Sequence, residues 1–223
     1  KIKKESGFNQ YEFDSDIFLI NQANYFLKIN KIKSSLQFYA QENGLMINYH
    51  PKPFIFDYGS AMHFNLNLKK KGCNIFDQNA IDENKPLLSL IAAILKLLNQ
   101  SLYLIFNNEE EFTRLYQQDE LKQKVTPTNL SWGGNNRTTM IRIPDRLPTC
   151  LEFRLPSANS NIIGVMMFLL TSIYYSIIHD DITPPQRCYG NAYQYRYSSI
   201  CKNLLEAKKC FSLNKIIDHS LSL

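Results

Sequence analysis

The stretch AMHFNLNL, residues 61–68, alternates apolar and polar side chains more clearly than any other part of the chain. Neighbouring side chains on a β-strand point to opposite faces of its sheet. The stretch therefore predicts a strand with its apolar residues on one face and His63, Asn65 and Asn67 on the other.

Two further stretches alternate in the same way, TTMIRIP at residues 138–144 and CLEFRLP at residues 150–156, with a tight turn between them. They add Arg142, Glu152 and Arg154 to one polar face. One interpretation is an antiparallel sheet with a solvated face. The residue types favour another, because His, Asn, Arg and Glu suit metal and bidentate anion binding better than the Lys, Glu and Thr of ordinary surfaces.

Long helices are expected around these strands. Asp14 or Ser15 would cap a helix that runs to about Asn43 and stops at Gly44. The apolar patterns predict further helices at residues 86–106, 162–178 and 203–210, and short strands at residues 10–13 and 45–54. The expected fold class is α+β, with an antiparallel β-sheet that has one polar active-site face and is backed by long helices.

Two apolar stretches raise the question of a membrane. Residues 86–106 include Lys96, Asn99 and Gln100, and residues 162–178 are too few for an ordinary span of about 20 apolar residues. Both are interpreted as buried helices, with membrane spans as the alternative.

Charge and cysteine content exclude several classes of protein. The net charge of +5 is mild, and the longest basic run is residues 69–71, so no nucleic-acid-binding stripe is predicted. The five cysteines form an odd set without a C-x-x-C pair, which argues against a disulfide framework or a structural zinc site. This cysteine pattern favours a reducing, cytoplasmic location.

The N-terminal residues Glu5 and Glu12 add two carboxylates. Their odd spacing would place them on opposite faces of one regular strand, but Gly7 and Asn9 permit a bend that brings them together. Carboxylates with one imidazole suit Mg²⁺ or Mn²⁺, and arginines suit phosphate or carboxylate groups. This combination suggests phosphoryl transfer.

Several stretches together resemble the glutamine synthetase family. The resemblance lies in motifs that follow the family's order between about residues 5 and 162: ESGFNQYEF, NYHPKPF, GSAMHFNLNL, FTRLYQ, SWGGNNRTTMIRIP and CLEFRLPSAN. The segments SWGGNNRT and PPQRCYGNAY look closest to the branch of the γ-glutamyl-polyamine ligases. The resemblance implies a single but incomplete catalytic domain over residues 1–223, without the family's N-terminal β domain and C-terminal end.

The resemblance also implies a role for each matching residue. The expected metal ligands for Mg²⁺ or Mn²⁺ are Glu5, Glu12, His63 and Glu152. The residues expected to bind the amino-acid substrate are Gly59, Arg114 and Arg154. The residues expected to bind ATP are Asn65, Arg137 and Arg142, of which Arg137 is also a catalytic candidate. Glu120 would accept a proton from ammonium, but this match is loose, and a solvated loop residue is the favoured alternative.

The chain departs from the family pattern at several positions. Asn65 stands where a second His is frequent, and Cys150 stands where an Arg commonly precedes the metal-binding Glu. Tyr58 and Asn9 replace a usual Asn and Gly, and no Pro follows Asn159.

The activity implied by the resemblance is an ATP-dependent ligase that forms a γ-glutamyl amide from glutamate and ammonia. One alternative is a ligase for polyamines or alkylamines. Another is an inactive remnant that at most binds nucleotide. The family also implies a homo-oligomer built as a double ring.

Overall fold

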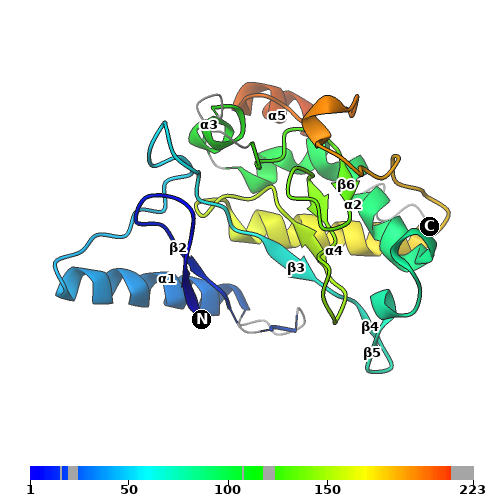
Figure 1. Ribbon diagram of the computed structural model, residues 1–223, viewed down its shortest axis with the longest axis horizontal. Coiled ribbons are helices and arrows are strands. Elements are labelled where there is room, and N and C mark those ends of the chain that lie inside the picture. The colour runs from blue at the N-terminus through cyan, green and yellow to red at the C-terminus, as the bar shows by residue number, and fades with distance from the viewer. Residues whose placement is uncertain (16, 20–24, 107, 118–123, 212–223) are drawn as a thin grey trace.

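A mixed sheet of four short strands forms the centre of the protein (Figure 1). The computed structural model describes residues 1–15, 17–19, 25–106, 108–117 and 124–211. The strand order is β3-β8-β7-β6, with the bounds β3 Phe64–Leu66, β8 Leu151–Phe153, β7 Ile141–Arg142 and β6 Trp132–Gly133. The pairs β3–β8 and β8–β7 are antiparallel, as predicted, whereas β6 pairs with β7 in parallel.

The register separates the two faces of this sheet. Phe153 lies opposite both Phe64 and Ile141, while Glu152 lies opposite both Asn65 and Arg142. The apolar side chains Ile141 and Phe153 are fully buried. The predicted alternation is thus confirmed across three strands, although β3 is shorter than the alternating stretch at residues 61–68.

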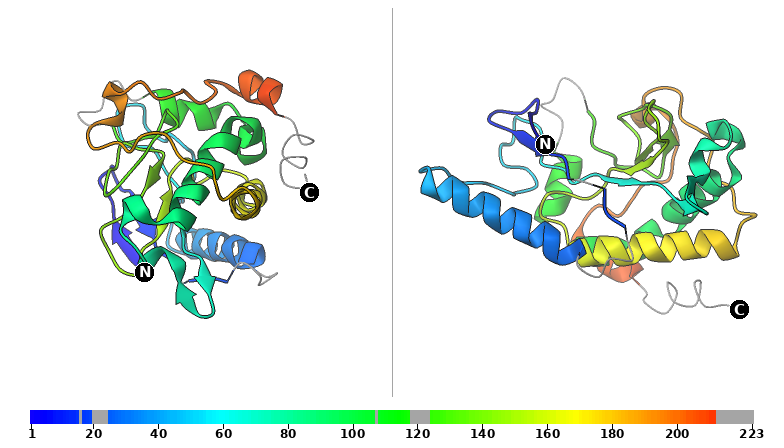
Figure 2. Two further views of the ribbon diagram at one scale, coloured as in Figure 1. Left: turned by 90° about the vertical axis from the view of Figure 1, so that its right-hand side faces the viewer. Right: turned by 90° about the horizontal axis from the view of Figure 1, so that it is seen from below.

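Two apolar helices, α2 (Lys85–Ile105) and α4 (Ile162–Ile178), cover the apolar face of the sheet (Figure 2). The ring of Phe168 in α4 lies 5.5 Å from that of Phe153 in β8. The start of α2 is fixed by Asn84, whose buried side chain accepts a hydrogen bond from the backbone of Leu87. These contacts make the helices and the sheet one hydrophobic core.

Helix α2 is long and apolar enough to cross a membrane by length and composition. In this structure 67% of its most apolar 18-residue stretch is buried inside the protein. A core helix passes the same test of composition, and the burial favours the interpretation of α2 as a core helix.

The first long helix differs from its prediction. Helix α1 spans Tyr25–Glu42, so its end agrees with a stop at Gly44, which has φ +66°. Its start is wrong in the prediction, because Asp14, Ser15 and residues 17–19 are not helical. Asp14 instead closes an N-terminal hairpin, where its backbone amide donates to the Lys1 carbonyl at 2.8 Å.

The remaining elements are short. The N-terminal hairpin consists of β1 (Ile2–Lys4) and β2 (Tyr11–Phe13), and a second hairpin consists of β4 (Lys69–Lys70) and β5 (Cys73–Asn74). The part of the chain that the structure describes also contains the 3₁₀ helices η1 Ile75–Asp77, η2 Ile81–Glu83 and η3 Ala192–Gln194, and the short α-helices α3 Glu110–Tyr116 and α5 Leu204–Cys210. Residues 45–54 form no strand, contrary to the prediction. All five cysteines are free.

A buried carboxylate joins α3 to the loop that follows β8. Glu111 is fully buried and accepts a hydrogen bond from the Ser160 hydroxyl at 3.0 Å, while its Oε1 has no hydrogen-bond partner. Burial raises the pKa of Glu111, although the two nearby serines and the charges of Arg114 and Lys33 oppose this effect.

We expect Glu111→Gln to stabilise the protein at neutral pH. A carboxyl whose pKa is raised by folding binds more protons in the folded state, so its contribution to stability is lost as pH rises through that raised pKa. The gain in Tm of the variant over the wild type should therefore be larger at pH 7.5 than at pH 5. Thermal melts of Glu111→Gln and of the exposed neighbour Glu110→Gln at both pH values test this. An equal, pH-independent difference for both variants would refute it.

Gly164 sets the distance between the two core helices. A Cβ built at this position would overlap the backbone carbonyl of Leu104 in α2, which cannot move away without disturbing that helix. We expect Gly164→Ala to destabilise the protein by about 1–3 kcal/mol, as overpacked cores do. Urea unfolding compared with Ile163→Ala, which truncates a half-exposed neighbour, measures the effect. If Gly164→Ala unfolds at the wild-type urea concentration, α2 and α4 do not pack as closely as described.

Candidate active site

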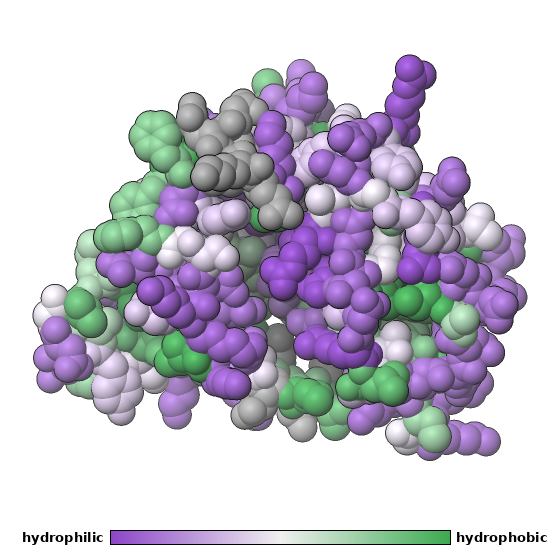
Figure 3. Space-filling model, viewed as in Figure 1, coloured by the Kyte–Doolittle hydropathy of each residue, from purple (hydrophilic) through white to green (hydrophobic). Residues whose placement is uncertain are grey.

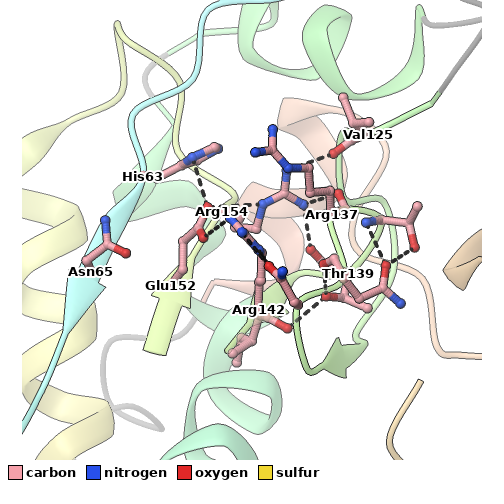
Figure 4. Close-up of polar contacts among 12 residues, drawn as sticks. His63, Asn65, Val125, Arg137, Thr139, Arg142, Glu152 and Arg154 are labelled. Atoms are coloured by element: carbon pink, nitrogen blue, oxygen red, sulfur yellow. Dashed lines mark hydrogen bonds and ion pairs between the residues drawn. The ribbon is translucent and has the colours of Figure 1, made fainter. Parts of the chain in front are cut away.

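Glu152, in the middle strand β8, is the centre of the polar face (Figure 4). Its Oε2 lies 2.8 Å from a terminal nitrogen of Arg142 on β7. Its Oε1 lies 3.1 Å from Nδ1 of His63, just before β3, and 3.4 Å from Nε of Arg154. Two guanidiniums and one imidazole thus surround one carboxylate. His63 and Arg142 come from other segments of the chain, and Arg154 directly follows β8 itself.

This polar face is not an ordinary solvated surface. Glu152 and Arg154 are each only 5% exposed, although hydrophilic residues gather across the middle of this side of the molecule (Figure 3). Buried charges of this kind are retained where they are paired. The interpretation of the face as a plain solvated surface is therefore wrong for β8.

The protonation states of Glu152 and His63 are set by their surroundings. Burial opposes ionisation of Glu152, but the contact with His63 and the charges of Arg154 and Arg142 outweigh it and lower its pKa to about 2. Burial lowers the pKa of His63, whose side chain is 30% exposed. At neutral pH the pair consists of an ionised carboxylate and a neutral imidazole.

This donor set fits a divalent cation. Metal binding requires a neutral imidazole and a deprotonated carboxylate. Two ligands at right angles in an octahedral site with bonds of about 2.1 Å lie about 3 Å apart, close to the 3.1 Å between His63 Nδ1 and Glu152 Oε1. The same spacing also suits a direct hydrogen bond between the two side chains, so the pair is satisfied with or without an ion.

Arg154 and Arg114 are buried, and their guanidiniums donate hydrogen bonds to backbone carbonyls. Arg154 donates to the carbonyls of Arg137, Thr139 (3.0 Å) and Val125 (3.2 Å), and Arg114 donates to those of Leu155 and Pro156. Burial lowers the pKa of both guanidiniums to about 10, so both stay charged at neutral pH. Nε of Arg114 has no hydrogen-bond partner, and Nε of Arg154 has only the ion-pair contact with Glu152.

Gly59 packs directly on Arg114. A Cβ at position 59 would lie 2.5 Å from Cγ of Arg114 and 2.7 Å from the carbonyl oxygen of Pro51. A side chain here would therefore displace the Arg114 stem or the backbone. This close approach explains why glycine occupies the position predicted to line the substrate pocket.

The N-terminal hairpin brings the two predicted carboxylates together. Asn9 adopts φ +49° in its turn, and Glu12 pairs in register with Lys3. Burial and a hydrogen bond with Glu5 raise the pKa of Glu12, as expected for two carboxyl groups in contact. Gln10 connects the hairpin to the site, because its side-chain amide donates to the Gly59 carbonyl at 3.0 Å.

The four predicted metal ligands form two pairs in this structure. His63 contacts Glu152, and Glu5 contacts Glu12. Among the described residues, no group of three or more His, Cys, Asp or Glu side chains is placed to hold one ion. A single site with all four ligands therefore stays a prediction. The structure brings the ligands together only within each of the two pairs.

The predicted nucleotide residues have different surroundings. Arg142 donates from Nε to the side chain of Asn135 at 2.9 Å, in addition to its pairing with Glu152. Asn65, Glu152 and Arg142 form a row across β3, β8 and β7, which we call the polar row. Asn65 lies at one end of it, where its Oδ1 accepts a hydrogen bond from Arg146 at 2.9 Å. Arg137 contributes a backbone carbonyl to Arg154. Glu120 lies outside the described residues.

Two polar residues of this site were not predicted from the sequence. Asn135 orients Arg142, and Arg146 extends the row of cations beyond Asn65. The signal for Asn135 was its place in the matched segment SWGGNNRT. Arg146 belongs to the turn between two site strands, a position that alone gives little indication of a role.

Comparison with known proteins agrees with the geometry. Residues 1–222 match the sequence model of the family described as glutamine synthetase, catalytic domain. The chain is 32% identical over 160 residues to a glutamine synthetase of Clostridium saccharobutylicum, covering 69% of this chain and 34% of that protein. It is 28% identical over 150 residues to the gamma-glutamylputrescine synthetase PuuA of Escherichia coli K12, covering 66% and 30%.

A solved structure has the same fold. The structure titled "Apo GmaS without ligand" superposes with a TM-score of 0.72 at 24% identity, covering 87% of this chain and 45% of that one. The chain spans only about a third of the length of the curated relatives described above, 34% and 30%. On the match over residues 1–222, the chain belongs to the glutamine synthetase family, within its catalytic domain.

Proposed function

We propose that this chain is a catalytic part of an ATP-dependent ligase that joins an amine to the γ-carboxylate of glutamate, with ammonia as the leading acceptor. The observation that carries the proposal is the buried Glu152, held by His63, Arg142 and Arg154 on one sheet face. Family membership supports the same conclusion. The organisation as a single, incomplete catalytic domain also stays a prediction.

His63 and Glu152 are the residues that would hold Mg²⁺ or Mn²⁺, and Glu5 and Glu12 would complete the ligands from the hairpin. Such an ion supplies charge neutralisation between the anionic groups of ATP and glutamate. The hairpin is already connected to the substrate side of the site through Gln10 and Gly59. That connection supports the inclusion of its two carboxylates.

The arginines supply positive charge at fixed places. Arg142 and Arg137 would bind the phosphates of ATP, together with Asn65. Arg114 and Arg154 would bind the glutamate carboxylate and the phosphoryl group in transfer, and Gly59, predicted to line the substrate pocket, lets Arg114 pack closely against the backbone. Because phosphoryl transfer depends on positioning and charge stabilisation, fixed guanidiniums are the groups that such a reaction needs.

The reaction has two steps. A γ-carboxylate oxygen of glutamate takes the terminal phosphoryl group of ATP, and the bond to ADP breaks. The amine nitrogen then attacks the carbonyl carbon, phosphate leaves with the carboxylate oxygen, and the nitrogen loses a proton. Glu120 is the predicted acceptor of a proton from ammonium, whose removal gives the nitrogen the lone pair that attacks.

The amine is the finer part of the proposal. The relatives described above are named for two different products, glutamine and γ-glutamylputrescine, at 32% and 28% identity. Putrescine-type polyamines and alkylamines are therefore the alternative acceptors. A cytoplasmic location and a homo-oligomeric double ring accompany this proposal.

A second candidate is a remnant that binds nucleotide without turnover. The separation of the four predicted ligands into two pairs favours it, as do Asn65 and Cys150 at positions where the family often has His and Arg. Incomplete ligand sets bind metal weakly because the remaining carboxylates are poorly compensated.

We expect the full chain to release phosphate from ATP only when Mg²⁺ or Mn²⁺, glutamate and an amine are all present. Ammonium, methylamine and putrescine should be compared as acceptors. Glu152→Gln should lower turnover on the order of 100-fold, the scale for loss of one group that stabilises a transition state. The control Glu42→Gln, an exposed residue of α1, should have wild-type turnover.

Two outcomes separate the candidates. Phosphate release that ignores glutamate and amine would contradict the ligase. No release with any acceptor, combined with a metal-dependent rise in Tm on addition of ATP, would identify the remnant instead.

A further inference from the structure

Arg146 lies at the edge of the polar row, in the turn between β7 and β8. Its terminal nitrogen Nη2 lies 2.9 Å from Oδ1 of Asn65 on β3 and 3.3 Å from Sγ of Cys150. Two residues that depart from the family pattern thus contact the same guanidinium. Asn65 is not a free amide on this face but a partner of Arg146.

Both direct partners of this guanidinium are neutral side chains. Arg142 and Arg154 share the charge of Glu152 through ion pairs, whereas no carboxylate in the described ranges lies within ion-pair distance of Arg146. The hydrogen bond with Cys150 is the main cause that raises the pKa of Arg146, and the charges of Glu152 and Asp14 add to it only at longer range. The residue is exposed, so an external anion can reach it.

The register places Asn65, the hydrogen-bond partner of Arg146, and Arg142 on opposite sides of Glu152. Asn65, Glu152 and Arg142 lie side by side on β3, β8 and β7. Strands are about 4.8 Å apart, so the outer two positions are separated by about 10 Å. Arg146 is bonded to the residue at one end of this row and Arg142 forms the other end. An elongated polyanion along the row would have a guanidinium at each end.

We propose that Arg146 is a further phosphate-binding residue of the nucleotide site, and that Asn65 acts as a positioning residue that holds it. The inference rests on the proposed function, since ATP is the polyanion that the site would take. Arginine suits this task because its planar fork donates two hydrogen bonds to one phosphate group. The phosphate would then supply the direct counter-ion that the Arg146 guanidinium lacks among the described residues.

The test measures binding to the full chain with Mg²⁺ by calorimetry, with ATP, inorganic tripolyphosphate and adenosine as probes. Arg146→Gln should weaken ATP and tripolyphosphate binding on the order of 10-fold, as loss of a charge-assisted contact does, and leave adenosine binding unchanged. Arg146→Lys should lie between the wild type and Arg146→Gln. Arg196→Gln removes the same charge from an exposed arginine outside this row and should behave as the wild type.

The positioning role of Asn65 has its own readout. Asn65→Ala should weaken ATP binding in the wild-type background but cause no further loss in Arg146→Gln, because its effect passes through Arg146. Equal losses in both backgrounds would overturn this role and leave Asn65 as an independent contact.

The outcomes distinguish failure of this inference from failure of the proposed function. If the wild type binds ATP and Arg146→Gln binds it equally well, the inference is overturned while the proposed function stands. If Arg146→Gln loses adenosine and ATP alike, the phosphate role is overturned. A wild type that binds no nucleotide overturns both. If Arg146→Gln without ligand has a much lower Tm than Arg196→Gln, the ATP affinity of Arg146→Lys is compared with that of the wild type instead. Equal affinities would then overturn the inference.

Discussion

The contacts of one buried carboxylate with three neighbouring side chains are the constraint on which the site depends. His63 comes from a distant part of the sequence, Arg142 from the adjacent strand β7, and Arg154 from two residues beyond Glu152 itself. An ionised carboxylate that is 5% exposed is stable only with partners, and Glu152 has His63, Arg142 and Arg154. His63 lies just before β3, Arg142 lies on β7, and Arg154 directly follows β8, the strand of Glu152 itself. The charge of Glu152 therefore fixes the relative positions of β3, β7 and β8 as well as the chemistry of the face.

The buried arginines contribute a second structural role. The strands of the central sheet are only two or three residues long, so their own ladder hydrogen bonds are few. Arg154 and Arg114 add donors to the carbonyls of the loops that follow or flank these strands. A guanidinium has five donors in fixed geometry and can satisfy several carbonyls at once. The same groups that suit an anionic substrate thus hold together a sheet that would otherwise be weakly paired.

Part of this arrangement could be predicted because it depends on local periodicity. The alternation in residues 61–68 and 150–156 predicted which side chains share a face, and the apolar run at residues 162–178 matched α4. The start of α1 was wrong because Asp14 closes the hairpin by pairing with residues of β1, a contact that no helix-capping rule anticipates. The parallel pairing of β6 and the burial of the polar face depend on packing between distant segments. Arg146 was missed for the same reason, since only the fold places it beside Asn65.

The segment around Gly59 contacts the N-terminal hairpin on one side and Arg114 on the other. The Gly59 carbonyl accepts a hydrogen bond from Gln10 of the hairpin that carries Glu5 and Glu12, and its Cα packs against Arg114 on the substrate side. The same segment leads within four residues to His63. Glu5 and Glu12 repel each other when both are ionised, and a cation near the hairpin relieves that repulsion. The backbone at Gly59 thus contacts the hairpin through Gln10, packs against Arg114 and continues to His63, so these parts of the polar face share one short piece of chain.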